Sequence, residues 1–233
     1  MWGNRERDNW FLHAHFWDPH TPYRAPESFG NPFAEVPLDT WIDETVLEEH
    51  KKAVGPHGIN ELGMYTDQIA PGYPRMPGSA QDMAGLRRVM DGYDTGILYA
   101  DYLVGQLLDL LKEQGLYEDT AIFITSDHGE NMGELAIYSE HGTADYPTCH
   151  IPFIMKWPGC KAGSVDSGLH YSLDLLPTMA QLLGVEPWEK WDGQSFAPAV
   201  TEGKAAGREY LVLSQMAHVC QRSARCGDWI SIR

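Results

Sequence analysis

Cysteine is scarce in this chain of 233 residues, and the four that it has are not arranged as metal ligands. They stand at Cys149, Cys160, Cys220 and Cys226, so no two of them form the C-x-x-C pair typical of a structural zinc site. Structural zinc is therefore not expected, and the cysteines leave disulfide pairing and cellular compartment open.

Basic residues and long apolar runs are also lacking. The 17 Lys and Arg residues stand against 33 Asp and Glu, which gives a formal net charge of -16. A protein of this sign repels phosphate, so a nucleic-acid partner is not expected. No apolar run approaches the roughly 18 to 20 residues that a membrane helix needs, so a membrane span is not expected either.

Apolar and aromatic residues are plentiful, and their pattern alternates between strand and helix. With 43% hydrophobic residues the chain can bury a sizeable core. A short apolar strand is predicted at 10–16, followed by a loop rich in Pro and Gly at 23–77 that holds one possible helix at 39–52. Since strands and helices alternate from there on, the expected fold class is α/β.

The clearest element is a long helix over 82–114, where apolar residues recur at three- and four-residue steps. Gly115 marks its end. Gly92, Gly96 and Gly105 each cost about 1 kcal/mol relative to Ala inside such a helix, so close packing or a kink is expected at each.

The carboxyl-terminal half adds shorter elements. The pattern predicts a strand at 151–157, a helix at 174–183, and antiparallel strands at 210–214, 219–224 and 229–232. We expect residues 1–205 to form most of an α/β domain and residues 206–233 to begin a small antiparallel subdomain.

A candidate site follows the apolar run 121–126, which predicts a buried parallel strand. This run ends directly in Asp127-His128-Gly129-Glu130, and ligands of open α/β sheets bind at such strand ends. Asp127 and His128 offer a carboxylate and an imidazole, which together suit a divalent cation. Taken alone, the dipeptide is more often an ordinary pair of loop residues.

The wider sequence around that dipeptide is more specific. Residues 125–134, T-S-D-H-G-E-N-M-G-E, and 151–159, I-P-F-I-M-K-W-P-G, resemble the sulfatases of the alkaline phosphatase superfamily. Residues 16–23 resemble their upstream histidine segment, and 174–179 resembles a helix common among them. The resemblance implies part of an alkaline-phosphatase-like three-layer sandwich.

Site roles follow from this resemblance. Asp127 and His128 match two ligands of a divalent metal, with calcium expected first and manganese as the alternative. His20 matches a histidine that contacts sulfate and protonates the leaving group. The family's sulfate-binding lysine lies eleven residues before the proline that is Pro152 here, and counting back reaches His141. His141 either serves the same sulfate oxygen or is a surface histidine of its loop.

One family feature is absent from the sequence. Sulfatases carry their nucleophile in a C-x-P-x-R or S-x-P-x-R segment whose first residue becomes formylglycine, and no such segment occurs here. The early pair of metal-binding Asp residues is also missing. We therefore expect a fragment, inactive alone, whose formylglycine and remaining ligands belong to a missing amino-terminal part.

The resemblance predicts hydrolysis of a sulfate ester, with a sulfated small molecule or carbohydrate as substrate. A phosphodiesterase or phosphonate monoester hydrolase of the same superfamily is the alternative enzyme, because spacing cannot separate sulfur from phosphorus. A noncatalytic, metal-binding remnant is the alternative outside enzymes. The identity of the ester, the oligomeric state and the compartment stay open.

Overall fold

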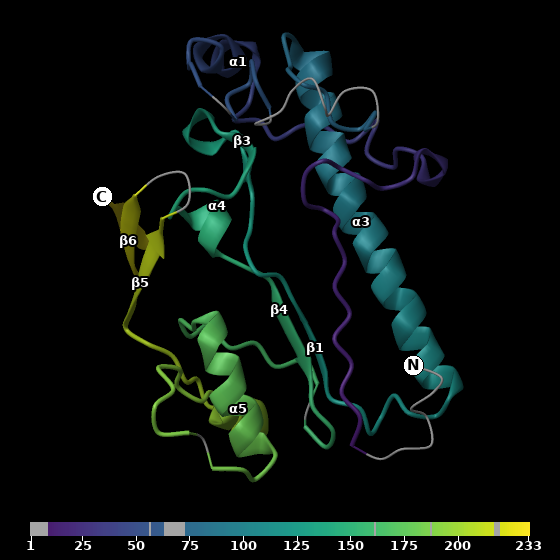
Figure 1. Cartoon of the computed structure of the whole chain (residues 1–233), viewed down its shortest axis with the longest axis vertical. Coiled ribbons are helices and arrows are strands. Elements are labelled where there is room, and N and C mark those ends of the chain that lie inside the picture. Colours follow the sequence, from purple (N-terminus) through teal and green to yellow (C-terminus); the bar gives the residue numbers. More distant parts are fainter. Residues whose placement is uncertain (1–8, 56, 63–72, 161, 187, 217–219) are drawn as a thin grey trace. The chain divides into compact units, whose positions relative to one another are not determined.

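The computed structural model describes residues 9–55, 57–62, 73–160, 162–186, 188–216 and 220–233 (Figure 1). The chain divides into two compact units. The first joins Met1–Leu107 with Leu135–Ser139, and the second joins Leu108–Glu134 with Glu140–Arg233. The separate subdomain predicted for 206–233 stays a prediction.

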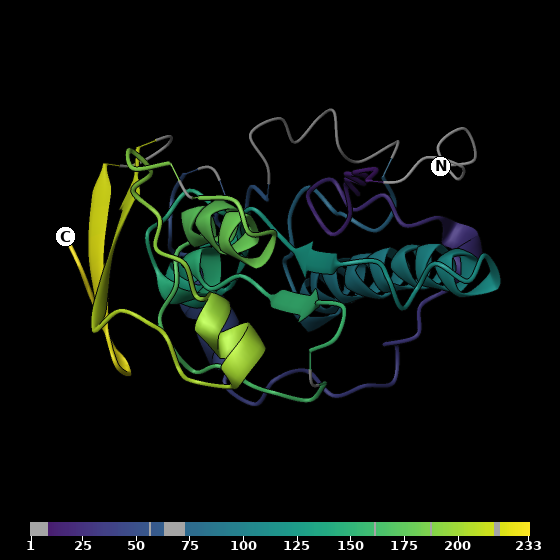
Figure 2. The ribbon, with the colours of Figure 1, turned by 90° about the horizontal axis from the view of Figure 1, so that it is seen from below.

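The long predicted helix is confirmed as α3, Met83–Glu113, the teal coil in Figures 1 and 2. Its first turn is closed by Asp82, whose Oδ1 accepts a hydrogen bond of 2.7 Å from the Gly85 N–H. Gly115, at φ 68°, follows its end in the left-handed region that glycine adopts without strain. Leu86 and Val89 lie fully buried on its inner face.

The glycines inside α3 differ in their surroundings. A Cβ added at Gly92 would lie 2.7 Å from the Tyr23 ring, and one at Gly96 would lie 3.0 Å from Cα of Pro19. Close packing is therefore confirmed at both positions. Nothing lies within 4 Å of a Cβ added at Gly105, so packing does not account for that glycine.

The described residues within 23–77 are mostly irregular, as predicted. They contain η2, Glu27–Phe29, and α1, Glu44–His50. The predicted helix at 39–52 is shorter than expected because Asp43 caps it, accepting a hydrogen bond of 2.9 Å from the Val46 N–H.

The strand predicted at 10–16 is wrong. These residues belong to no strand, and most of them are exposed. An apolar run becomes a strand only where a neighbour pairs with its backbone groups, and the described chain provides no such neighbour here. His20 therefore follows an irregular segment and lies in a turn, where its N–H donates to the Trp17 carbonyl at 3.0 Å.

In the second unit, β1, Ile122–Thr125, pairs with β4, Phe153–Lys156. The pairing is antiparallel and the strands are only partly buried, so the prediction of a buried parallel strand is wrong on both counts. The apolar run did mark the strand, but such a run carries no information on the direction of its neighbour.

Polar side chains fasten the two ends of this strand pair. Lys156 donates to the carbonyls of Tyr117, Glu118 and Thr120 at 2.7, 2.9 and 3.2 Å, which ties β4 to the segment leading into β1. At the other end, Thr125 Oγ1 donates to the Pro152 carbonyl at 2.9 Å. The start of the loop after β1 is thereby held in place.

The carboxyl-terminal elements confirm the predicted helix and antiparallel strands. Strands β5, β6 and β7 pair in that order and are drawn in yellow in Figure 2. Val219, in the predicted strand at 219–224, lies outside the described residues. The element bounds in this part are α5 Leu175–Leu182, α6 Ala197–Glu202, β5 Tyr210–Gln215, β6 Gln221–Cys226 and β7 Trp229–Ile232.

Short elements lie between these. They are β2 Asn131–Met132, η3 Glu134–Ala136, β3 Tyr138–Glu140, α4 Tyr146–Cys149 and η4 Ser172–Asp174. Within the part of the chain that the structure describes, no helix combines the length and apolar character needed to cross a bilayer.

A buried ion pair joins α5 to the segment before β5. Asp174 is fully buried and accepts hydrogen bonds from the Arg208 guanidinium and from the N–H groups of Gln194 and Tyr171. Burial acts to raise the pKa of this carboxyl, but these hydrogen bonds outweigh it and hold the pKa below its usual range. The pair makes Asp174 a structural carboxylate.

Candidate functional site

The loop that follows β1 places Asp127 and His128 side by side. The Oδ1 atom of Asp127 lies 3.8 Å from Nε2 of His128, and the same oxygen accepts a hydrogen bond of 3.2 Å from the His128 N–H. The Asp127 side chain is 77% exposed, while that of His128 is 26% exposed. A carboxylate open to solvent thus stands beside a half-buried imidazole.

The tautomer of His128 follows from its backbone contact. Its Nδ1 lies 2.8 Å from the Gly129 carbonyl oxygen, and because a carbonyl only accepts, Nδ1 is the donor. In the neutral ring the lone pair is then on Nε2, the nitrogen nearer to Asp127. Fixing the tautomer through the remote nitrogen is how proteins orient metal-binding histidines.

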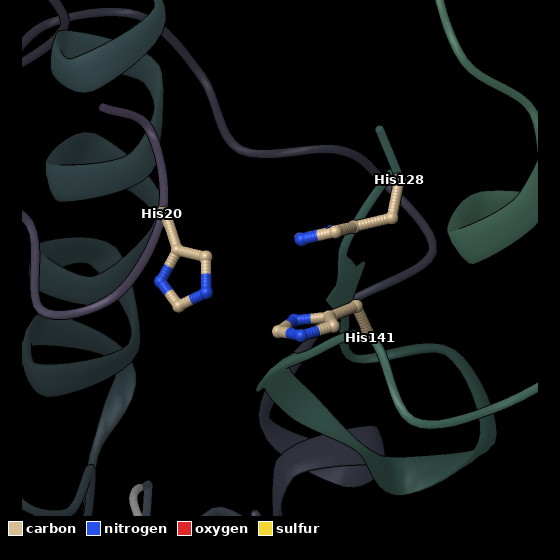
Figure 3. Close-up of side chains that lie close together, drawn as sticks. All are labelled: His20, His128 and His141. Carbon is tan, nitrogen blue, oxygen red and sulfur yellow. The ribbon is translucent and has the colours of Figure 1, made fainter. Parts of the chain in front are cut away.

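His141 packs against His128 within the same unit. The ring centroids are 3.7 Å apart and the ring planes differ by 16°, so the two imidazoles are stacked, as Figure 3 shows. The structure therefore brings three of the predicted site residues together: Asp127, His128 and His141.

A buried polar cluster, Asn131, Thr143, Asp145 and Thr148, lies in the segments that follow the two histidines. The Asn131 amide donates to Oγ1 of Thr143 at 2.7 Å and to Oγ1 of Thr148 at 3.0 Å. Thr143 Oγ1 donates to Asp145 Oδ1 at 3.1 Å. All four side chains are buried.

Proton counting orients this cluster completely. A threonine hydroxyl has one hydrogen, and that of Thr143 goes to the Asp145 carboxylate. The 3.2 Å contact between the two hydroxyls must therefore be donated by Thr148. Every hydrogen bond then runs from Asn131 towards Asp145, so the cluster has a single arrangement that joins the His128 segment to the His141 segment.

Gly129 makes the tight loop possible. Its N–H donates to the Thr148 carbonyl at 2.7 Å, and a Cβ at this position would collide with the Pro147 carbonyl group. Only glycine lets the backbone approach this closely. The loop that carries His128 is thus pinned against α4.

His20 belongs to the other unit. Its Nδ1 donates to the Thr21 carbonyl at 2.5 Å, and its ring lies 4.8 Å from that of Trp17. This leaves Nε2 as the nitrogen able to exchange a proton in acid-base chemistry. The role of His20 as the histidine that contacts sulfate and protonates the leaving group stays a prediction.

Comparison with known proteins connects this geometry to a family. The profile of the family described as Sulfatase matches residues 2–185. The chain belongs to the sulfatase family. The run from Thr125 to Glu134 and the segment around His20 both fall inside the matched region, as the sequence predicted.

The curated relatives of this chain are distant and longer. The chain is 27% identical over 208 residues to the multifunctional alkaline phosphatase superfamily protein PehA of Trinickia caryophylli, with 86% of this chain and 39% of that protein aligned. It is 28% identical over 213 residues to the choline-sulfatase of Rhizobium meliloti, with 84% and 37% aligned. This sulfatase chain thus spans less than two fifths of their length.

A solved structure shows the fold. The phosphonate monoester hydrolase SpPMH of Silicibacter pomeroyi superposes with a TM-score of 0.73 and 23% identity, covering 100% of this chain and 49% of that one. The predicted alkaline-phosphatase-like α/β fold, followed by a small antiparallel sheet, is confirmed.

The donor set of Asp127 and His128 fits a divalent cation. Atoms 3.8 Å apart on Asp127 and His128 can both bind one ion at the usual bond lengths of about 2.0–2.6 Å. The mix of carboxylate oxygen and imidazole nitrogen, with the tautomer already set, suits that role.

Sequence reasoning missed the polar cluster and two glutamines, Gln215 and Gln221, that contact the His141 loop. Asp145 carried a readable signal, since an Asp before a Pro-containing turn is typical of a helix N-cap, and its side chain does accept from the Thr148 N–H. The glutamines carried none, because they are far from His141 in sequence.

Proposed function

We propose that this chain supplies the metal-binding and sulfate-contacting part of a hydrolase that cleaves a sulfate ester. Membership of the sulfatase family supports the reaction class. The observation that carries the proposal is the pairing of Asp127 Oδ1 with His128 Nε2 at 3.8 Å, beside the stacked ring of His141.

Each side chain has a proposed role. Asp127 and His128 would hold the divalent metal, calcium first and manganese second, and a bound metal neutralises sulfate charge and activates a nucleophile. His141 donates a hydrogen bond to a sulfate oxygen in place of a lysine. His20 protonates the leaving-group oxygen through Nε2, as a general acid.

The proposed substrate is a sulfated small molecule or carbohydrate. One relative is a choline-sulfatase, which supports a small sulfated substrate among the candidates. We propose formylglycine, carried on another segment, as the attacking group.

This chain alone is proposed to be inactive, because its sequence has no C-x-P-x-R or S-x-P-x-R segment. The purified chain should not hydrolyse an aryl sulfate even with calcium or manganese present. Turnover that disappears in the Asp127→Ala variant would overturn this statement.

The metal site is tested by titrating the purified chain with Mn²⁺ and Ca²⁺, followed by calorimetry and by Mn²⁺ paramagnetic resonance. Asp127→Asn and His128→Ala should each weaken affinity by at least about tenfold, since each removes one ligand atom. A second Asp-His pair in the same unit provides the matched control: Asp166 Oδ2 lies 3.0 Å from His170 Nε2. His170→Ala should leave metal affinity unchanged. Equal losses at His128 and His170 would contradict the assignment.

A second candidate is hydrolysis of a phosphodiester or phosphonate monoester at the same site. The similarity to PehA, which is named as a multifunctional protein of the alkaline phosphatase superfamily, supports this second candidate. Inorganic sulfate and phenylphosphonate should be titrated separately into the Mn²⁺-loaded chain. Tighter binding of sulfate that depends on His141 supports the sulfatase reading, and tighter binding of phenylphosphonate supports the second candidate. Metal binding with no response to either anion would indicate a noncatalytic, metal-binding remnant.

A further inference from the structure

Two glutamines at the closed end of the β5–β6 hairpin, where β5 leads on towards β6, contact the loop that carries His141. Gln215 ends β5, Gln221 begins β6, and the two are direct cross-strand partners. Gln215 Nε2 donates to the His141 carbonyl at 3.1 Å, and Gln221 Oε1 accepts from the Ala144 N–H at 3.0 Å. The hairpin thus holds both ends of residues 141–144.

One glutamine side chain donates a hydrogen bond to the loop and the other accepts one from it, and the orientation of each amide is fixed. Gln215 Oε1 accepts from the Met216 N–H at 2.8 Å, which directs its NH₂ group to the His141 carbonyl. A carbonyl can only accept, so Gln215 must be a donor. An N–H can only donate, so Gln221 must be an acceptor. Each contact therefore requires a different half of the glutamine amide.

The same short loop is held from its other side. Thr143 joins the buried polar cluster through Asn131 and Asp145, and Ala144 is fully buried. Cluster and hairpin together fix the backbone on both sides of residues 141–144. With the backbone held, the His141 ring has little freedom except its own side-chain torsions, and it stacks on His128.

We infer that Gln215 and Gln221 are positioning residues of the site: they set the backbone of the His141 loop and thereby keep the His141 ring on His128. The antiparallel carboxyl-terminal sheet is then part of the frame of the site rather than a separate appendage. The functional meaning rests on the proposed function, but the positioning itself is a property of this chain and needs neither metal nor substrate.

The difference between donor and acceptor gives a sharp test by substitution. Gln221→Glu keeps an acceptor for the Ala144 N–H and should preserve the loop. Gln215→Glu replaces a donor with an acceptor facing the His141 carbonyl and should displace the loop. Gln215→Ala and Gln221→Ala each remove one contact. Ser214→Ala, an exposed neighbour on β5, is the matched control.

The measurement is the nuclear Overhauser cross-peak between ring protons of His128 and His141 in the metal-free chain, assigned with His141→Ala. Gln215→Glu, Gln215→Ala and Gln221→Ala should weaken it several-fold, while Gln221→Glu and Ser214→Ala should retain it. Thermal unfolding confirms that each variant is folded; if Gln215→Glu is not, Gln215→Ala decides. An unchanged cross-peak in a folded Gln215 variant, or equal loss in both Gln221 variants, would overturn the inference. If the parent chain fails to bind metal while the variants show the expected pattern of cross-peaks, the result counts against the proposed function alone.

Discussion

Thr143 does two things with one hydroxyl: it accepts from the Asn131 amide and donates to the Asp145 carboxylate. Replacing it with valine, which has nearly the same shape, would leave a buried amide and a buried carboxylate each without one partner. We expect Thr143→Val to lower the free energy of unfolding by about 1–3 kcal/mol, and Thr143→Ser to change it much less. Urea unfolding of both variants checks this, and a loss in Thr143→Val no larger than that in Thr143→Ser would show that the hydrogen bonds of the hydroxyl do not set the stability of the cluster.

Asp174 gives the chain a pH-dependent contribution to stability. Its pKa is lowered in the folded state, so the folded state binds fewer protons there than the unfolded state. The contribution is fully present above the unfolded pKa of about 3.9 and is lost as pH falls through the folded pKa. The parent should therefore exceed Asp174→Asn in stability near neutral pH, with the difference shrinking below about pH 4. Urea unfolding between pH 3 and pH 7 measures it, and a constant difference would contradict the assignment.

For single residues, the sequence predicts contacts between side chains that are neighbours in the chain. Asp127 and His128 are neighbours in the chain, so their pairing needed only the motif, and the structure places them within 3.8 Å. The stacking of His141 on His128 could not be predicted, because it depends on where the chain returns after thirteen residues. The role of His141 towards sulfate stays a prediction.

Among the elements, α3 offers the cleanest test of packing against helix propensity. Gly92→Ala should destabilise the chain, because the new methyl group would meet the Arg75 backbone and the Tyr23 ring. Gly105→Ala should instead stabilise it by about 1 kcal/mol, since alanine is the better helix former and the space is open. Thermal unfolding of the two variants compares identical chemical changes in one helix, and shifts of the same sign would contradict this account.

Helices and strands were predicted correctly where a periodic pattern of apolar residues is long. The prediction failed where the structure depends on which strand pairs with which. Apolar residues recur at helical spacing along the 31 residues of α3, about eight and a half turns, which is why this helix was predictable. Residues 10–16 had the composition of a strand, but composition cannot supply a partner. The predicted parallel orientation of β1 was wrong for the same reason, since whether a strand is parallel or antiparallel depends on its partner.

For the whole molecule, the fold was predictable because family-specific segments recur in order along the chain, and the family match extends over residues 2–185. What sequence could not provide is the division into two units, in which Leu135–Ser139 joins the first unit from the middle of the second. Such an exchange is set by packing of a short segment, for example the fully buried Tyr138.

The exposed face of the β1–β4 pair has a consequence for how the isolated chain behaves in solution. Ile154 is 62% exposed, and within the described residues β1 and β4 pair with no further strand, so apolar side chains and open backbone edges are available to other copies. Mutual repulsion from a net charge of -16 opposes such association at low salt. Because the screening length falls from about 30 Å at 0.01 M salt to about 3 Å at 1 M, light scattering by the chain should rise with ionic strength.

Ile154→Lys should suppress that rise, whereas Val165→Lys, the same charge change at a 93% exposed loop residue, should not. A lysine makes the net charge less negative and so cannot suppress association through overall repulsion; equal suppression by both variants, or none by Ile154→Lys, would contradict association through the strand pair.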